Sequence, residues 1–316
     1  MTGASLATTA DESSHNSQFP LQTKRTMSQR IDKTTLLSRL EQAGIKGTFT
    51  IAFTPRCGST VLSNALTDAG LGRPAEYFQY PYTEQSPFGV TPGQHFEENF
   101  EALVLDRSAN GIFGSKTMHD HRAHLDDWLA STVDGYVTLD DILPNHRWVY
   151  IRRENSIKQA VSLYIADETG VWHMRRGSDS GTSPTEVRYD FFAILTKLMM
   201  LLSHEANWEA YFDKTGIQPL RITYESLTAS PSVFFTAMVG HLNVPEHEIT
   251  NARLSGSEGL DKISDRMGDV YRHIRERFTE DFLDIGRRDN RTRLGAGLER
   301  WVDFFGNQRW RTEDLQ

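Results

Sequence analysis

A short turn rich in hydroxyl and cationic side chains follows the first apolar run of the sequence. It reads TPRCGST, in which Arg56 precedes a cysteine, a glycine, a serine and a threonine, and a helical pattern comes next. Backbone amides at the start of a helix bind anions, because they have no partner within the helix. With Arg56 beside these amides, the turn predicts a site for a phosphate or sulfate group.

The turn lacks two residues that define the loop of nucleotide-triphosphate hydrolases, G-x-x-x-x-G-K-[ST]. Phe53 stands at the position of its first glycine and Ser59 at the position of its lysine. We therefore expect a small oxyanion rather than a triphosphate with Mg²⁺. A plain helix cap formed by Ser59 and Thr60 is the structural alternative. A thiol phosphatase with Cys57 as nucleophile would need an arginine where Ser63 stands.

A second cluster of anion-binding side chains follows another apolar run. Arg153 ends the expected strand RWVYIRR, and Ser162 lies on the helix that should follow. Ser156 and Gln159 would form the capping box of that helix. In open α/β sheets ligands bind at the carboxyl edge of the strands, so a nucleotide with phosphates at both ends of its ribose would contact both clusters. An exposed arginine and an ordinary helical serine are the alternative.

Four short β-rich runs are separated by long helical patterns. They span residues 48–54, 111–117, 147–153 and 219–225. Parallel strands need helical crossovers, so this order predicts an α/β fold with a P-loop-type parallel sheet flanked by helices, and extra helices in the C-terminal half. Helices are expected over 31–43, 154–166, about 185–214, after 231 and over 262–283.

One of these helices carries the patch FFAILTKLMMLL, which is apolar nearly all round. Such a patch predicts burial, within the chain or in a subunit contact. A homodimer through helix 185–214 is therefore an expectation.

Composition limits the class of protein. The chain has 316 residues, a formal charge of −8 and one cysteine, Cys57. The acidic balance argues against a nucleic-acid-binding surface, and a single cysteine excludes an intrachain disulfide or a zinc site of several thiolates. We find no transmembrane run or secretory signal, which predicts a cytoplasmic protein. Residues 1–30 read as a disordered leader and 31–316 as a single domain.

Four blocks in the same order carry a family resemblance: TPRCGST, GRPAEYFQY, FGSKTM and IRRENSIKQAVSLYIADETGVWH. They resemble the sulfotransferases that use 3′-phosphoadenosine 5′-phosphosulfate, most closely the bacterial trehalose 2-sulfotransferase family. The likeness covers roughly residues 48–286 by order and spacing of the blocks. It implies an enzyme that moves a sulfuryl group to a hydroxyl, with adenosine 3′,5′-bisphosphate as the product and no metal.

The resemblance assigns donor contacts to particular positions. The first loop would hold the 5′-phosphosulfate, with Arg56 also touching the transferring group, and the 3′-phosphate would lie against Arg153 and Ser162. Tyr224 would lie near the adenine. Gly295 and Gly297 would permit a close approach to the cofactor, with Arg293 as a contact. The loop residues are Arg56, Cys57, Gly58, Ser59 and Thr60.

The resemblance also implies catalytic roles. Glu76 matches a glutamate thought to take the proton of the acceptor hydroxyl, and Lys116 would offset charge on the leaving oxygen. His119 is the second candidate for the base, because other branches use a histidine shortly after such a lysine. The family name further implies a small-molecule acceptor of carbohydrate type, which would be bound by Gln79, Tyr80 and Trp172.

Three alternatives stay open. A small-molecule kinase of the same architecture would need the missing lysine and an acidic metal ligand at a strand end. A non-catalytic nucleotide-binding protein would keep the loop without turnover, although Glu76 and Lys116 are both present. A metal site could draw on His119, His121 and His124, but the stretch lacks a carboxylate ligand pattern.

Overall fold

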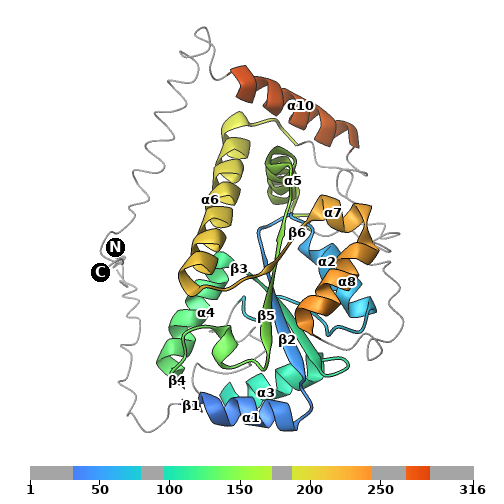
Figure 1. The fold of residues 1–316 in the computed structure, drawn as a ribbon. Coiled ribbons are helices and arrows are strands. Elements are labelled where there is room, and N and C mark those ends of the chain that lie inside the picture. Colours follow the sequence, from blue (N-terminus) through green and yellow to red (C-terminus); the bar gives the residue numbers. More distant parts are fainter. Residues whose placement is uncertain (1–30, 80–95, 173–186, 244–267, 285–316) are drawn as a thin grey trace, which may run out of the picture.

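A four-stranded parallel sheet forms the centre of the molecule in the computed structural model, which describes residues 31–79, 96–172, 187–243 and 268–284 (Figure 1). The strand order is β3-β2-β5-β6. This arrangement confirms the predicted α/β class with a helix-flanked parallel sheet. The strands are β2 (Gly47–Phe53), β3 (Ile112–Met118), β5 (His146–Arg152) and β6 (Leu220–Thr223). A separate parallel pair joins β1 (Ile31–Asp32) to β4 (Val133–Asp134).

Strand β2 lies between β3 and β5 and is buried along its whole length. Its last residue, Phe53, pairs with Met118 at the end of β3 and with Ile151 near the end of β5. The segments that follow the three strands therefore meet at one edge of the sheet. That edge is where both predicted anion clusters fall.

Helices cover both faces of the sheet (Figure 1). One face carries α1 (Lys33–Gln42), α3 (Phe96–Arg107), α4 (His119–Thr132) and the second half of α6 (Phe191–Thr215). The other face carries α2 (Ser59–Asp68), α7 (Tyr224–Ala229) and α8 (Pro231–Leu242). A third core joins α5 (Ser156–Thr169), the first half of α6 and α10 (Gly268–Asp284), so the extra C-terminal helices are confirmed.

Helix α6 differs from its prediction in where it begins. It was expected from about residue 185, but residues 187–190 are not helical and the helix begins at Phe191. The carboxylate of Asp190 accepts a hydrogen bond from the amide of Ala193 at 3.0 Å. An N-cap side chain of this kind satisfies an orphan amide and fixes the start of a helix.

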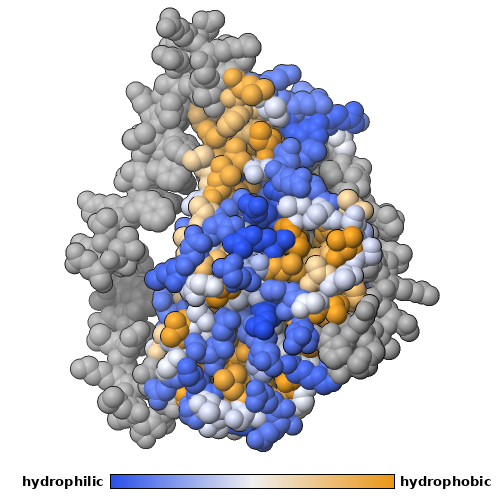
Figure 2. All heavy atoms as spheres, viewed as in Figure 1, coloured by the Kyte–Doolittle hydropathy of each residue, from blue (hydrophilic) through white to orange (hydrophobic). Residues whose placement is uncertain are grey.

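The apolar patch of α6 is only partly buried within the chain. Met199 is 44% exposed and Leu202 is 42% exposed, so the patch presents one side to the surface. Figure 2 shows hydrophobic atoms gathered along this helix. Among the described helices, none combines the length and the apolar content needed to cross a membrane.

Two helix starts were misread for the same reason. The strand expected over 219–225 ends at Thr223, whose hydroxyl accepts from the amide of Ser226 at 3.0 Å and begins α7. Helix α5 begins after Asn155, whose side chain accepts from the amide of Lys158 at 2.8 Å. Because Asn155 is the cap, the predicted capping box of Ser156 and Gln159 is wrong.

A buried histidine at the start of β5 makes the stability of the fold depend on pH. Nδ1 of His146 lies 2.9 Å from the hydroxyl of Thr48, and burial lowers its pKa from 6.5 to about 4. The unfolded chain therefore binds the proton more tightly than the folded chain. We expect a contribution of about 1 to 3 kcal/mol that is full above the unfolded pKa and is lost as the pH falls toward the folded one.

Urea unfolding at several pH values between 6.5 and 4 measures this contribution. His146→Gln should flatten the acid-side loss of stability relative to wild type. His273→Gln, at an exposed position on α10, should keep the wild-type slope. Identical slopes for wild type and His146→Gln would mean that other groups cause the acid sensitivity.

Candidate functional site

The first predicted anion loop lies between the end of β2 and the start of α2. Gly58 is the N-cap of α2, with φ 95°, a left-handed conformation that side chains rarely adopt. A Cβ added there would lie 2.4 Å from Cδ2 of Tyr224. Only a glycine fits at this position, since Tyr224 at the start of α7 packs directly against the loop.

Cys57 is a structural residue of this loop. It is fully buried, and burial raises its pKa to about 11. The thiol therefore stays protonated near neutral pH and is not a nucleophile, which removes the remaining basis for a thiol phosphatase. The backbone amides that could bind an anion are those at the start of α2, which follow Gly58.

Arg56 connects the loop to the second cluster. Its Nε donates to the hydroxyl of Ser162 at 3.0 Å, and its Nη1 donates to the carbonyl of Trp172 at 2.5 Å. Arg56 also has a left-handed backbone, with φ 65°, which directs the chain out of the strand. Three residues that the sequence placed in different parts of the site are therefore in direct contact.

Arg153 lies close to Arg56. Burial, and then the charge of Arg153, lower the pKa of Arg56. Arg153 follows β5 directly, and its guanidinium lies 5.4 Å from the ring centre of Tyr224. Its Nε is buried and makes no hydrogen bond within the described residues, although Oε1 of Glu225 is 3.8 Å away. Two neighbouring guanidinium groups with an open buried donor fit a doubly charged phosphate.

Gln159 is a contact that sequence reasoning missed. It is fully buried on α5, and its Nε2 donates to the hydroxyl of Thr54 at 2.8 Å and the carbonyl of Pro55 at 2.7 Å. These bonds fix the start of the anion loop to α5. The residue had been assigned to a local cap, and no local pattern indicates a partner so distant in the chain.

Glu76 and Lys116 form an ion pair, with Oε1 and Nζ 3.1 Å apart. A backbone bridge between Ala75 and Ser115 brings them together, and the amide of Lys116 donates to the carbonyl of Ala75 at 2.9 Å. The ammonium of Lys116 also lies 5.2 Å from the ring centre of Phe53 at the end of β2. The pair therefore lies at the same sheet edge as the anion loop.

His119 begins α4 and faces other groups. Its Nε2 lies 3.4 Å from Nη2 of Arg122, its Nδ1 lies 3.6 Å from Asp120, and its ring meets the edge of Trp208. His121 is different: burial lowers its pKa, and the charge of Glu76 partly offsets this. His121, for which the sequence offered only the metal hypothesis, is thus within electrostatic reach of Glu76.

The metal alternative finds no grouping to support it. Where the structure describes the chain, which includes all three histidines of the 119–124 stretch, no set of three or more His, Cys, Asp or Glu side chains is arranged to hold a metal ion.

Two of the three predicted acceptor residues, Gln79 and Trp172, lie within the described part of the chain. The amide of Gln79 donates to the carbonyl of Glu76 at 3.3 Å, and Trp172 is 45% exposed near Arg56. Tyr80 and the cofactor contact Arg293 lie outside the described residues.

Comparison with known proteins adds independent information. The sequence profile described as Stf0 sulphotransferase matches residues 48–274. A protein named trehalose 2-sulfotransferase from Mycolicibacterium smegmatis is 26% identical over 252 residues, covering 68% of this chain and 89% of that protein. One of the same name from Mycobacterium tuberculosis is 28% identical over 213 residues, covering 57% and 78%.

Proposed function

Because the chain belongs to the Stf0 sulphotransferase family, we propose that it moves the sulfuryl group of 3′-phosphoadenosine 5′-phosphosulfate to a hydroxyl of a small carbohydrate-like acceptor. One observation carries the choice of donor: the hydrogen bond from Arg56 to Ser162 joins the two anion clusters, with Arg153 close by. Two adjacent anion clusters suit a nucleotide that has phosphates on both sides of its ribose. When bound, the donor supplies the activated sulfuryl group.

Each cluster has its own binding task in this proposal. The amides of Gly58, Ser59 and Thr60, together with Arg56, bind the 5′ end. Arg153 and Ser162 bind the 3′-phosphate, and the open Nε of Arg153 supports this assignment. The ring of Tyr224 packs on Gly58 and lies near Arg153, which supports its proposed contact with the base.

Glu76 is proposed as the general base. Its carboxylate accepts the proton of the acceptor hydroxyl, while the ammonium of Lys116 holds it in place and offsets negative charge on the leaving oxygen. Their separation of 3.1 Å supports a shared role. His119 remains the second candidate for the base, and its contacts with Arg122 and Asp120 make it the weaker one.

The acceptor and the assembly are proposals as well. The names of both relatives suggest a sugar, and an exposed aromatic side chain such as Trp172 suits the face of a sugar ring. A homodimer would cover the apolar side of α6, where Met199 and Leu202 are exposed. The cytoplasmic location stays a prediction from the sequence.

A kinase is the second candidate function, and the site favours it less. Strand β5 ends in Arg152 and is followed by Arg153, where a kinase of this architecture would place an acidic metal ligand. Ser59 stands at the position of the phosphate-binding lysine. A sulfuryl group carries less charge than a phosphoryl group, so Arg56 and Lys116 can supply the neutralisation.

Calorimetric titration distinguishes the two candidates. We expect the purified protein to bind adenosine 3′,5′-bisphosphate and to show no heat of binding with ATP and Mg²⁺. The bisphosphate fits both clusters, whereas the triphosphate has no lysine to receive it. Binding of ATP without binding of the bisphosphate would overturn the sulfotransferase donor site and favour the kinase.

A further inference from the structure

Helix α10 packs on the part of the molecule that carries the second anion cluster (Figure 1). Tyr271, Ile274 and Phe278 of α10 are buried in one core with residues of α5 and α6. These three residues define the inner side of the helix, and Tyr271 is the one nearest to its beginning.

The phenol of Tyr271 lies one helical turn from the arginine–serine contact. Its hydroxyl donates to the carbonyl of Lys158 at 3.0 Å. Lys158 and Ser162 are four positions apart on α5 and so lie on the same side of that helix. Since Ser162 receives the hydrogen bond of Arg56, Tyr271 fixes α10 beside the proposed 3′-phosphate site.

The charges of three arginines act on this phenol. Burial raises the pKa of Tyr271, and the charges of Arg153, Arg275 and Arg56 each act against that rise. Arg275 stands one turn after Tyr271 on α10, and its Nη2 lies 3.5 Å from Oε1 of Glu276. Arg56 and Arg153 are the two cations already assigned to the nucleotide, and Arg275 comes from a third segment.

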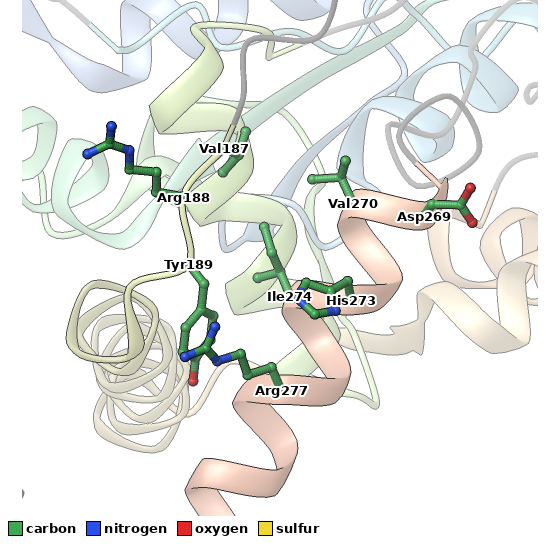
Figure 3. Close-up of a pocket in the computed structure, with 8 residues that line it drawn as sticks. All are labelled: Val187, Arg188, Tyr189, Asp269, Val270, His273, Ile274 and Arg277. Carbon is green, nitrogen blue, oxygen red and sulfur yellow. The ribbon is translucent and has the colours of Figure 1, made fainter.

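Next to this inner side, α10 also packs against residues 187–189. A groove of about 460 Å³ lies between α10 and residues 187–189 (Figure 3). Within it Arg277 lies over the ring of Tyr189, 4.4 Å from its centre, and the Tyr189 hydroxyl donates to Asp281 at 2.5 Å. The contacts of Tyr189 with Arg277 and Asp281 therefore hold α10 in place.

We propose that α10 forms one wall of the nucleotide site, in which Tyr271 positions the helix against α5 and Arg275 is a third cation for the 3′-phosphate. The inference rests on the proposed donor and extends it, because Arg275 lies just beyond the residues 48–274 that match the family. Tyr271 is a positioning residue, since its hydroxyl is bound to Lys158.

Binding measurements on folded variants test this wall. Adenosine 3′,5′-bisphosphate and adenosine 5′-monophosphate are titrated into wild type, Arg275→Gln and Tyr271→Phe, with thermal unfolding as a check of folding. Arg275→Gln should weaken the binding of the bisphosphate about tenfold and the binding of the monophosphate less than about twofold. Tyr271→Phe should reduce the preference for the bisphosphate about threefold.

The control is Arg272→Gln, which removes an exposed arginine of the same helix that pairs with Asp269 at 2.6 Å. It should bind both nucleotides as wild type does. Two results would overturn the proposed role of α10 and leave the donor proposal intact. In one, Arg275→Gln weakens the binding of both nucleotides equally. In the other, Arg275→Gln weakens neither, while Arg153→Ala does weaken the binding of the bisphosphate. Failure of the wild type to bind the bisphosphate would instead overturn the donor proposal together with the wall.

Discussion

Replacing Glu76 by glutamine is expected to abolish sulfuryl transfer and to leave the binding of adenosine 3′,5′-bisphosphate unchanged. The amide keeps the size of the carboxylate but cannot accept the proton of the acceptor hydroxyl, so kcat should fall by about 10²- to 10⁴-fold. Transfer is measured from 3′-phosphoadenosine 5′-phosphosulfate to a sugar that the wild type accepts, with trehalose tried first. Bisphosphate affinity is measured on the same preparation.

Loss of an ion pair could by itself disturb the site, so a matched control is needed. Glu101 of α3 pairs with Arg39 of α1 at 2.7 Å and makes no ion pair with Glu76 or Lys116, so Glu101→Gln should retain full transfer. His119→Gln and His121→Gln test the histidines. Normal turnover of Glu76→Gln combined with its loss in His119→Gln would transfer the base role to His119.

The ion pair of Glu76 and Lys116 illustrates what a sequence can predict. Each residue was found from its own block, because the short motifs GRPAEYFQY and FGSKTM are recognisable locally. Their contact depends on the bridge between Ala75 and Ser115, which joins segments far apart in the chain. Pairings of this kind follow from tertiary packing and leave no local pattern.

Strands were easier to predict than helix ends. Strands β2, β3 and β5 lie within one residue of their expected bounds, because continuous apolar runs mark strands that are buried on both faces. The start of α7 at Tyr224 was missed, since ITYESL continues an apolar pattern and only the hydroxyl of Thr223 stops it. Asn155 and Asp190 decide the starts of α5 and α6 in the same way.

The sequence predicted the individual residues of the second cluster, but it did not predict the contacts that connect them to the rest of the site. Arg153 and Ser162 came from one block, and Arg56 from another. The bond between Arg56 and Ser162, the support from Gln159 and the proximity of Tyr271 all involve partners distant in the chain. They bring two motifs that are separate in the sequence into contact, as the proposed binding of a nucleotide with two phosphate ends requires.

Arg153→Ala should weaken the binding of adenosine 3′,5′-bisphosphate by about 1.5 to 3 kcal/mol, or roughly 10- to 150-fold in Kd. Its Nε is buried and open within the described residues, so a phosphate oxygen there would form a charge-assisted hydrogen bond. The loss should shrink for adenosine 5′-monophosphate, which lacks the group that Arg153 contacts. Titration calorimetry with both nucleotides measures the difference.

The neighbouring arginine separates a specific contact from general electrostatic attraction. Arg152 is exposed and lies over the ring of Tyr150, 5.8 Å from its centre, so Arg152→Ala removes the same charge without touching the cluster. It should bind both nucleotides nearly as wild type does. If the two alanine variants lose bisphosphate affinity equally, or if Arg153→Ala weakens both nucleotides alike, the 3′-phosphate does not lie against Arg153. A loss confined to Arg153 and to the bisphosphate would assign that phosphate to the cluster of Arg56, Arg153 and Ser162.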